Sequence, residues 1–203
     1  MAAKKSTKKS ATKSAKKSAR KPARKPAKRS ARRASAVRPR FALSSPDIRP
    51  DGPIRLEQVF NGFGCQGRNI SPGLAWSRAP EETRSFALLV HDPDAPTGGA
   101  GWWHWLVVNI PASETGLAKG AGTADGSNLP AGATQVTTDF GSPGWGGPCP
   151  PVGDKPHRYV FTLYALKTER LDVSGASASL AGYMVNGNAI GKAQLTGKFG
   201  RKS

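Results

Sequence analysis

The sequence predicts a mainly β protein, a β-sandwich with short C-terminal helices that is preceded by a disordered basic tail. Three observations predict this class. Short strand-like segments alternate with long Gly- and Pro-rich loops, helical periodicity occurs only near the C-terminus, and Lys and Arg are concentrated in the first fifth of the chain. We therefore divide the 203 residues into a tail over 1–40 and one folded domain over 41–203.

The tail carries nearly all of the net charge of +18. Residues 1–40 hold ten Lys and seven Arg with no Asp or Glu, whereas the rest of the chain has 14 basic and 13 acidic side chains. A segment made almost wholly of Lys, Arg, Ala, Ser, Thr and Pro cannot bury enough apolar surface to offset the entropy of ordering it. Pro22, Pro26 and Pro39 also oppose a continuous helix, so we expect disorder.

The first half of the domain is expected to hold three strands. A short strand over residues 54–60 follows a stretch that mixes Pro and Gly. Residues 85–92 and 104–110 predict two more strands. In both segments apolar side chains occupy the two alternating faces, as in strands that are covered on both sides.

Loops dominate the second half of the domain. Residues 111–151 are rich in Gly and Pro and are expected to form loops with one strand near 135–139. Residues 157–166, rich in Val, Phe, Tyr and Thr, give the clearest strand of the chain. Helical periodicity occurs over 177–193, where three glycines imply short, broken helices.

Two polar residues flank the loop over 92–103. If the strands on either side of this loop pair as antiparallel neighbours, Asp92 at the end of the first lies near His104 at the start of the second. A carboxylate beside an imidazole fixes the tautomer of the ring and raises its basicity, which suits a histidine that donates to an anion. His91 points to the opposite face from Asp92, and we interpret it as structural.

Two further polar residues share one face of the strand over 157–166. Side chains two positions apart point the same way in a strand, which places His157 and Tyr159 together above an apolar wall of Phe161 and Leu163. Each such residue alone is more often an ordinary packed side chain. Their common position at strand ends beside Gly- and Pro-rich loops nevertheless predicts a small pocket for an anionic group, shared with the pair described above.

Five sequence motifs follow one another along the domain: NISPGLAW (69–76), DPDAP (92–96), WHWLVVNIP (103–111), GPCPP (147–151) and HRYVFTLYAL (157–166). Together they resemble the phosphatidylethanolamine-binding protein family, whose bacterial branch is often called Raf kinase inhibitor-like proteins. The resemblance covers residues 54–200 and no part of the tail. It implies antiparallel sheets in a Greek-key β-sandwich, with a pocket that holds a phosphate or a similar anion.

The resemblance also assigns residues to this pocket. Carried over by position, they are Asp92, Pro93, His104, Pro148, Pro150 or Pro151, His157 and Tyr159. Gly146 and Gly147 would let backbone amides approach the anion as a nest, because glycine has no Cβ in the way. Family members often carry a tyrosine in the last strand near the pocket. This chain has Phe199 there, so the resemblance supplies no hydroxyl from the C-terminus.

These residues favour a non-enzymatic binding module. His104 and His157 would donate to a phosphoryl oxygen and Tyr159 would donate its hydroxyl. Asp92 would orient a histidine. The expected ligand is a phosphate-containing small molecule, a phospholipid headgroup, a nucleotide or a phosphorylated partner, and the resemblance implies regulation of a protein kinase or a protease. We expect no cofactor, no metal and no catalytic residue.

The alternative function is a small hydrolase that acts on a phosphate or acyl ester. The Asp, the two His and the Tyr of the pocket could serve as general acid and base in such an enzyme. The sequence has neither a G-x-S-x-G nor an H-E-x-x-H motif. Cys149 is the one possible nucleophile, although a small packing residue is the simpler interpretation.

The two cysteines, Cys65 and Cys149, are too few and too far apart for a zinc site without His or acidic residues at short spacing. In a reducing compartment the default is two free thiols. Each cysteine lies beside one of the motifs, so they could be neighbours in space. The sequence leaves their pairing open.

The basic tail is predicted to bind polyanions such as DNA or RNA. Lys and Arg that neutralise phosphates release counterions, so this binding needs no base contacts and should not depend on sequence. The alternative is a solvated tail that promotes solubility and has no partner. No apolar run suits a secretory signal or a transmembrane segment, so we expect a cytoplasmic protein, with nucleoid association if the tail binds DNA.

Overall fold

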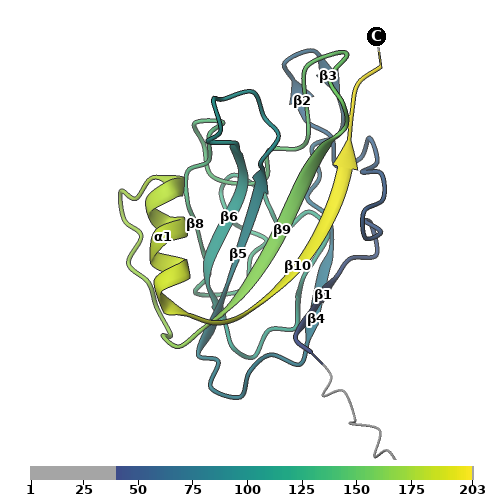
Figure 1. Cartoon of the computed structure of the whole chain (residues 1–203). Helices are drawn as coiled ribbons and strands as arrows, with labels where there is room; N and C mark the ends of the chain where they lie inside the picture. Colours follow the sequence, from purple (N-terminus) through teal and green to yellow (C-terminus); the bar gives the residue numbers. More distant parts are fainter. Residues whose placement is uncertain (1–39, 203) are drawn as a thin grey trace, which may run out of the picture. The chain divides into compact units, whose positions relative to one another are not determined.

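The computed structural model describes residues 40–202 of the chain. The prediction of a disordered tail therefore lies outside the described residues, apart from Arg40. The described part is mainly β, with antiparallel sheets and one helix, α1 (Ala178–Asn188), which confirms the predicted fold class (Figure 1). No helix in this part of the chain has the length and apolar content needed to cross a membrane.

A five-stranded antiparallel sheet forms the centre of the fold (Figure 1). Its strands in spatial order are β10 (Ala189–Phe199), β9 (His157–Leu166), β5 (Ser85–Asp92), β6 (Trp102–Pro111) and β8 (Thr134–Gln135). The predicted strands over 85–92 and 157–166 have the bounds of β5 and β9, and the strand predicted over 104–110 lies within β6. These three strands are adjacent in the middle of the sheet, a position that suits the two apolar faces of β5 and β6.

Smaller elements cover the central sheet. A three-stranded sheet of β1 (Ala42–Ser44), β4 (Leu74–Ser77) and β7 (Gly116–Leu117) packs on one face, and α1 covers the other (Figure 1). A separate hairpin consists of β2 (Asn61–Gly62) and β3 (Cys65–Gln66). The layers are therefore small sheet, large sheet and helix.

The alternating side chains of β5 divide the core into two clusters. Leu88 and Val90 belong to the cluster between the sheets, together with Trp76 of β4. Leu89 belongs to the cluster under α1, together with Val185. Burying a Leu or Val side chain stabilises the fold by roughly 1.5–3 kcal/mol relative to leaving it exposed, so β5 contributes on both of its faces.

The C-terminal segment differs from the predicted series of short helices. A single helix, α1, ends at Asn188, and the chain continues directly as β10 along the edge of the sheet. A Cβ at Gly191 would lie 2.9 Å from Pro80, and one at Gly197 would lie 2.7 Å from Ile54. These glycines therefore allow close packing of a strand rather than the interruption of a helix.

Two predicted strands are missing or short. Residues 54–60 form turns, with the Gln58 N–H donating to the Arg55 carbonyl at 3.0 Å. The prediction of a strand over 54–60 is therefore wrong. The apolar side chain of Val59, which favours a strand, is 1 % exposed although the residue lies in a turn. The strand predicted near 135–139 is reduced to β8, of which only the last residue lies in that range.

One end of the central sheet gathers the polar residues that the sequence singles out. β5 runs antiparallel to both β6 and β9, so its last residue, Asp92, lies at the same end of the sheet as the first residues of those two strands. The end of β10 lies there too, because Phe199 is opposite His157. The β2–β3 hairpin is found at this end of the domain in Figure 1.

Candidate functional site

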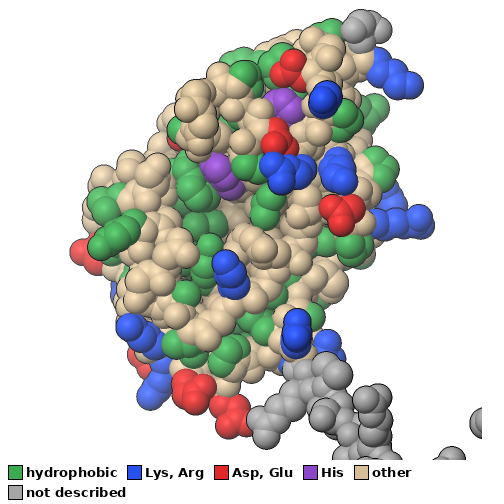
Figure 2. Space-filling view, in the orientation of Figure 1, with side chains coloured by type: hydrophobic (Ala, Val, Ile, Leu, Met, Phe, Trp, Pro, Cys, Tyr) green, Lys and Arg blue, Asp and Glu red, His purple; other side chains and the backbone are tan. Residues whose placement is uncertain are grey.

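A cavity of about 230 Å³ opens at this end of the sheet. The strands β5, β6 and β9 contribute its polar wall, which consists of Asp92, His104, His157 and Tyr159. Loop residues 95–97, the tip of the β2–β3 hairpin and the segment 149–151 form much of the remaining wall. Figure 2 shows histidine side chains in the upper half of the same view, one of them beside acidic and basic side chains. His104 and His157 are largely buried, at 3 % and 5 % exposed.

Asp92 and His157 form a buried hydrogen bond. His157 Nδ1 lies 2.8 Å from Asp92 Oδ2, and the two side chains are 6 % and 4 % exposed. An ionised carboxylate can only accept, so Nδ1 carries the proton and donates it. Asp92 Oδ1 accepts the backbone N–H of Asp94 at 2.8 Å. Asp92 is therefore held from two sides and fixes the tautomer and the orientation of His157.

Asp92 and His104 lie in the same cavity wall, as predicted, but the Asp92 carboxylate forms its side-chain hydrogen bond with His157 and not with His104. The ladder between β5 and β6 has an irregular register near the end of β5, and Asp92 lies opposite Trp102. The Asp92 carboxylate instead bonds the first residue of β9, its neighbour on the other side. The histidine that Asp92 orients is therefore His157.

His104 is buried and lacks a charge at neutral pH. Its Nδ1 donates to the Gly146 carbonyl at 2.6 Å, which leaves Nε2 as the nitrogen available to a ligand. Burial lowers the pKa of His104 from 6.5 to about 4, although the Gly146 carbonyl acts in the opposite direction. The rings of Phe140 and Tyr159 stand edge-on to the imidazole, with centroids 5.3 and 5.0 Å away.

Tyr159 brings an unpartnered hydroxyl to the cavity wall. The side chain has no exposed surface, and its oxygen makes no hydrogen bond of good geometry within residues 40–202, although the Asp92 carboxylate lies close enough to interact with it. Burial and the nearby Asp92 carboxylate raise the pKa of this hydroxyl, so it keeps its proton. An unpaired buried polar group costs about 1–3 kcal/mol, which an oxygen atom of a ligand would recover.

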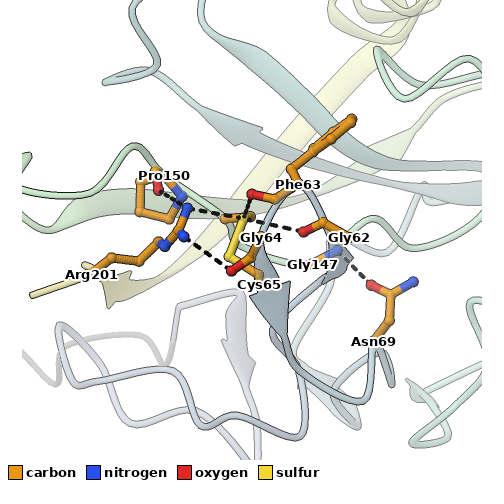
Figure 3. The surroundings of a disulfide bond; sticks show 9 residues. Gly62, Phe63, Gly64, Cys65, Asn69, Gly147, Pro150 and Arg201 are labelled. Atoms are coloured by element: carbon orange, nitrogen blue, oxygen red, sulfur yellow. Dashed lines mark hydrogen bonds between the residues drawn. A yellow bond between two sulfur atoms is a disulfide. The ribbon is translucent and has the colours of Figure 1, made fainter.

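The predicted amide nest at Gly146 and Gly147 is wrong. The Gly146 N–H donates to the His104 carbonyl at 2.9 Å. The Gly147 N–H donates to Asn69 Oδ1 at 2.8 Å (Figure 3). Both donors are used within the protein, and a Cβ on Gly147 would collide with the Gln58 carbonyl. These glycines allow close packing of the backbone and offer no donor to a ligand.

The prolines assigned to the pocket divide into two groups. Pro150 and Pro151 line the cavity. Pro148 is buried outside the wall, and its carbonyl accepts the Phe60 N–H at 3.1 Å. Pro93 is exposed in the loop that follows β5 and does not line the cavity either.

An ion pair fixes the loop on one side of the cavity. Arg158 Nη2 donates to Asp94 Oδ1 at 2.7 Å, and Arg158 Nε donates to Asp94 Oδ2 at 2.9 Å. The hydrogen bonds from Arg158 are the main reason that the pKa of Asp94 is lowered to about 2. Arg158 follows His157 in β9, so the ion pair ties loop residues 95–97 to the strand that carries the histidine.

Sequence reasoning missed the aromatic part of the wall. Phe63, Trp102 and Phe140 line the cavity. Phe140 packs against Phe60 and Trp102, with centroids 4.7 and 5.6 Å away. Phe63 and Phe140 belong to turns without a strand pattern, whereas Trp102 adjoins the WHW motif, which was the one available signal.

Two other residues discussed from the sequence lie outside the wall. His91 Nε2 is 3.0 Å from the Ala100 carbonyl, and its ring packs against Trp103 with 4.3 Å between centroids. These contacts agree with a structural role. Phe199 lies opposite His157 on β10 without lining the cavity.

A second carboxylate lies near the other nitrogen of His157. Asp154 Oδ2 is 3.5 Å from His157 Nε2, and this aspartate is 44 % exposed. An anion that bonds Nε2 therefore has to compete with Asp154. Within residues 40–202, no group of three or more His, Cys, Asp and Glu side chains is arranged to hold a metal ion.

Cys65 and Cys149 form a disulfide bond, with 6.0 Å between their Cα atoms (Figure 3). The expectation of two free thiols is wrong, because the β2–β3 hairpin brings Cys65 against a segment 84 positions further along the chain. Disulfides persist in oxidising surroundings, so this bond weighs against the predicted cytoplasmic location. Cys149 cannot act as a nucleophile while this disulfide is intact.

The fold and the cavity define a small antiparallel β protein of the ligand-binding type. The sequence profile of the family described as phosphatidylethanolamine-binding protein matches residues 44–200. The chain belongs to this family, as its five motifs indicate.

Similar proteins are found among bacteria. The UPF0098 proteins YbcL and YbhB of Escherichia coli K12 are 53 % identical over 163 residues and 46 % identical over 158 residues. These alignments cover 80 % and 77 % of this chain, and 88 % and 98 % of the relatives. The crystal structure of E. coli YbcL, described as a new member of the mammalian PEBP family, has a TM-score of 0.77 and 52 % identity, with 80 % of this chain and 99 % of YbcL covered. The CT736 structure from Chlamydia trachomatis has a TM-score of 0.67 and 32 % identity, with 80 % and 98 % covered.

His104 should remain uncharged down to about pH 4, because burial opposes its protonated form. The unfolded chain then takes up this proton first, so the free energy of unfolding should fall as the pH drops from 6.5 towards about 4. Replacing His104 by Gln should remove this part of the pH dependence. An NMR titration of the imidazole C–H resonances measures the pKa directly, and a His104 midpoint near 6.5 would contradict the assignment.

Proposed function

We propose that the cavity binds a phosphate-like anionic group and that the protein is a non-enzymatic binding module. The unpartnered hydroxyl of Tyr159 carries this proposal. It is a protonated donor at the wall of a cavity, beside His104 and His157. A phosphoryl oxygen is the kind of acceptor that would satisfy it.

The anion would bind together with protons. His104 and His157 each use Nδ1 inside the protein, so each can donate to a ligand only through Nε2 and only when it carries both protons. Within residues 40–202, no Lys or Arg belongs to the cavity wall. Positive charge in the pocket would therefore come from protonated imidazole, and the affinity for the anion should fall as the pH rises.

The ligand in the proposal is a phospholipid headgroup, a nucleotide phosphate or a phosphorylated partner. The description of the family supports the headgroup. Control of a protein kinase or a protease is supported only by the resemblance to Raf kinase inhibitor-like proteins. We do not propose hydrolysis, since Cys149, the one candidate nucleophile in the pocket, belongs to a disulfide.

Phosphate binding should depend on both pocket histidines. At pH 6, replacing His104 or His157 by Ala should weaken the binding of inorganic phosphate by roughly 10- to 100-fold, because each change removes a hydrogen bond to a charged group. Isothermal titration calorimetry on the full chain measures this affinity. His91→Ala is the matched control, since His91 lies outside the cavity wall, and it should bind like the parent chain. Unchanged affinity in both pocket variants would overturn the proposal.

We also infer that the tail binds nucleic acid or another polyanion. The charge of residues 1–40 supports this: 17 of the 31 Lys and Arg residues lie there, without any Asp or Glu. The rest of the chain is almost neutral and offers little attraction to a polyanion. The tail would bind the phosphates of any nucleic acid, and the specificity for a small ligand would depend on the pocket.

A chain that begins at Phe41 should lose DNA binding and keep its pocket. If the tail neutralises about 6 to 10 phosphates, the affinity of the full chain should fall by roughly 10³ to 10⁵ between 50 and 200 mM salt, with little preference for sequence. Fluorescence anisotropy on a labelled duplex, run with both chains across a salt series, measures this. Equal affinity of the two chains, or indifference of the full chain to salt, leaves the tail as a solubility extension.

A further inference from the structure

The disulfide joins two segments that both belong to the cavity wall. Cys149 lines the cavity together with Pro150 and Pro151. Cys65 lies in β3, and the turn before it places Phe63 in the same wall. The bond therefore links two parts of one pocket, which are 84 positions apart in the sequence.

Arg201 connects the same two segments without a covalent bond. Its Nη2 donates to the Gly64 carbonyl of the hairpin at 3.0 Å, and its Nη1 donates to the Pro150 carbonyl at 3.3 Å (Figure 3). Nη1 also lies 3.7 Å from Cys149 Sγ. Arg201 follows β10 in the chain, and its side chain bridges the β2–β3 hairpin and residues 149–151.

Few other contacts hold the hairpin, and one of them is the hydrogen bond from the Phe60 N–H to the Pro148 carbonyl at 3.1 Å. β2 and β3 contain two residues each and pair only with one another, and so short a hairpin is not stable alone in water. Phe63 is 72 % exposed, and its ring packs against Phe60 and against Phe140 of the cavity wall. A wall that rests on one disulfide, one guanidinium, one backbone hydrogen bond and a few ring contacts should become more mobile when the covalent link is cut.

We infer that the Cys65–Cys149 disulfide, together with Arg201, positions this wall for ligand binding, so that reduction of the disulfide weakens the binding of an anion. The inference rests on the proposed function of the pocket. In the reaction a dithiol transfers two electrons and two protons to the protein disulfide. The protein gains two thiols, and the dithiol becomes a cyclic disulfide.

Ligand binding and the redox state are then linked in both directions. A pocket whose wall is already ordered binds with less loss of conformational entropy than one whose wall must be ordered by the ligand. By thermodynamic linkage, a bound anion must oppose reduction by the same factor by which reduction weakens binding. A dithiol can reach the bond through Cys149, which is partly exposed and lines the cavity.

The test compares phosphate affinity in the oxidised and reduced full chain at one pH. Dithiothreitol reduces the protein, thiol counting verifies the reduction, and circular dichroism verifies that the fold persists. The affinity should fall by at least about 5-fold, the lower end of ordinary coupling between sites. Hydrogen exchange should accelerate in the hairpin and at the Cys149 amide but not in β9. The dithiol concentration needed for half reduction should rise when phosphate is present.

Arg201→Ala keeps the disulfide and tests the noncovalent part of the link, should the reduced chain unfold. This variant should bind phosphate more weakly than the parent chain, and Arg201→Lys should restore part of the affinity. Arg84→Ala is the control, because Arg84 forms an exposed ion pair with Glu169 beside the start of β5, far from the cavity wall.

Two results would overturn the inference, and they differ in what they say of the pocket. Equal affinity in the oxidised and reduced chains, with unchanged binding in Arg201→Ala, would reject the positioning role and leave the proposed function intact. Absence of phosphate binding in every form would reject both.

Discussion

The hydrogen bond between Asp92 and His157 joins the end of β5 to the start of β9, and the candidate site is arranged around it. Both groups are buried, and a buried carboxylate is tolerated only where hydrogen bonds satisfy it. The antiparallel register that brings these two residues together also brings His104 and Tyr159 to the same edge of the sheet. Strand pairing thus decides which polar groups meet, while loops and the disulfide close the cavity around them.

The histidines give the cavity an unusual proton balance. Each ring donates its Nδ1 proton to a group of the protein, so that the neutral rings present lone pairs rather than donors. Tyr159 supplies a protonated hydroxyl to this wall that makes no hydrogen bond within the described residues, although the Asp92 carboxylate lies nearby. An anion can accept hydrogen bonds from the two histidines only if each ring takes up a second proton from solution. Binding of an anion by this pocket should therefore depend on pH.

The sequence could predict the central strands but not the contacts at their ends. Both faces of β5 are apolar, and β9 is rich in Val, Phe, Tyr and Thr, so the sequence defines the bounds of both strands. The alternation along β9 also places His157 and Tyr159 on one face. The partner of Asp92 depended on a register irregularity that no local pattern reveals. The disulfide joins residues that are 84 positions apart, a distance over which the sequence predicts no pairing. The sequence pattern predicts that Gly191 breaks a helix, whereas in the structure it allows close packing of β10 against Pro80.

Proton uptake on anion binding tests the account most directly. Sulfate is a suitable probe because it does not titrate near neutral pH, so any proton taken up belongs to the protein. Calorimetric titrations of the full chain with sulfate at pH 6, in buffers of different ionisation enthalpy, give the number of protons bound per anion. The account predicts a net uptake that is smaller when His104 is replaced by Gln. Sulfate binding without any uptake of protons would contradict it.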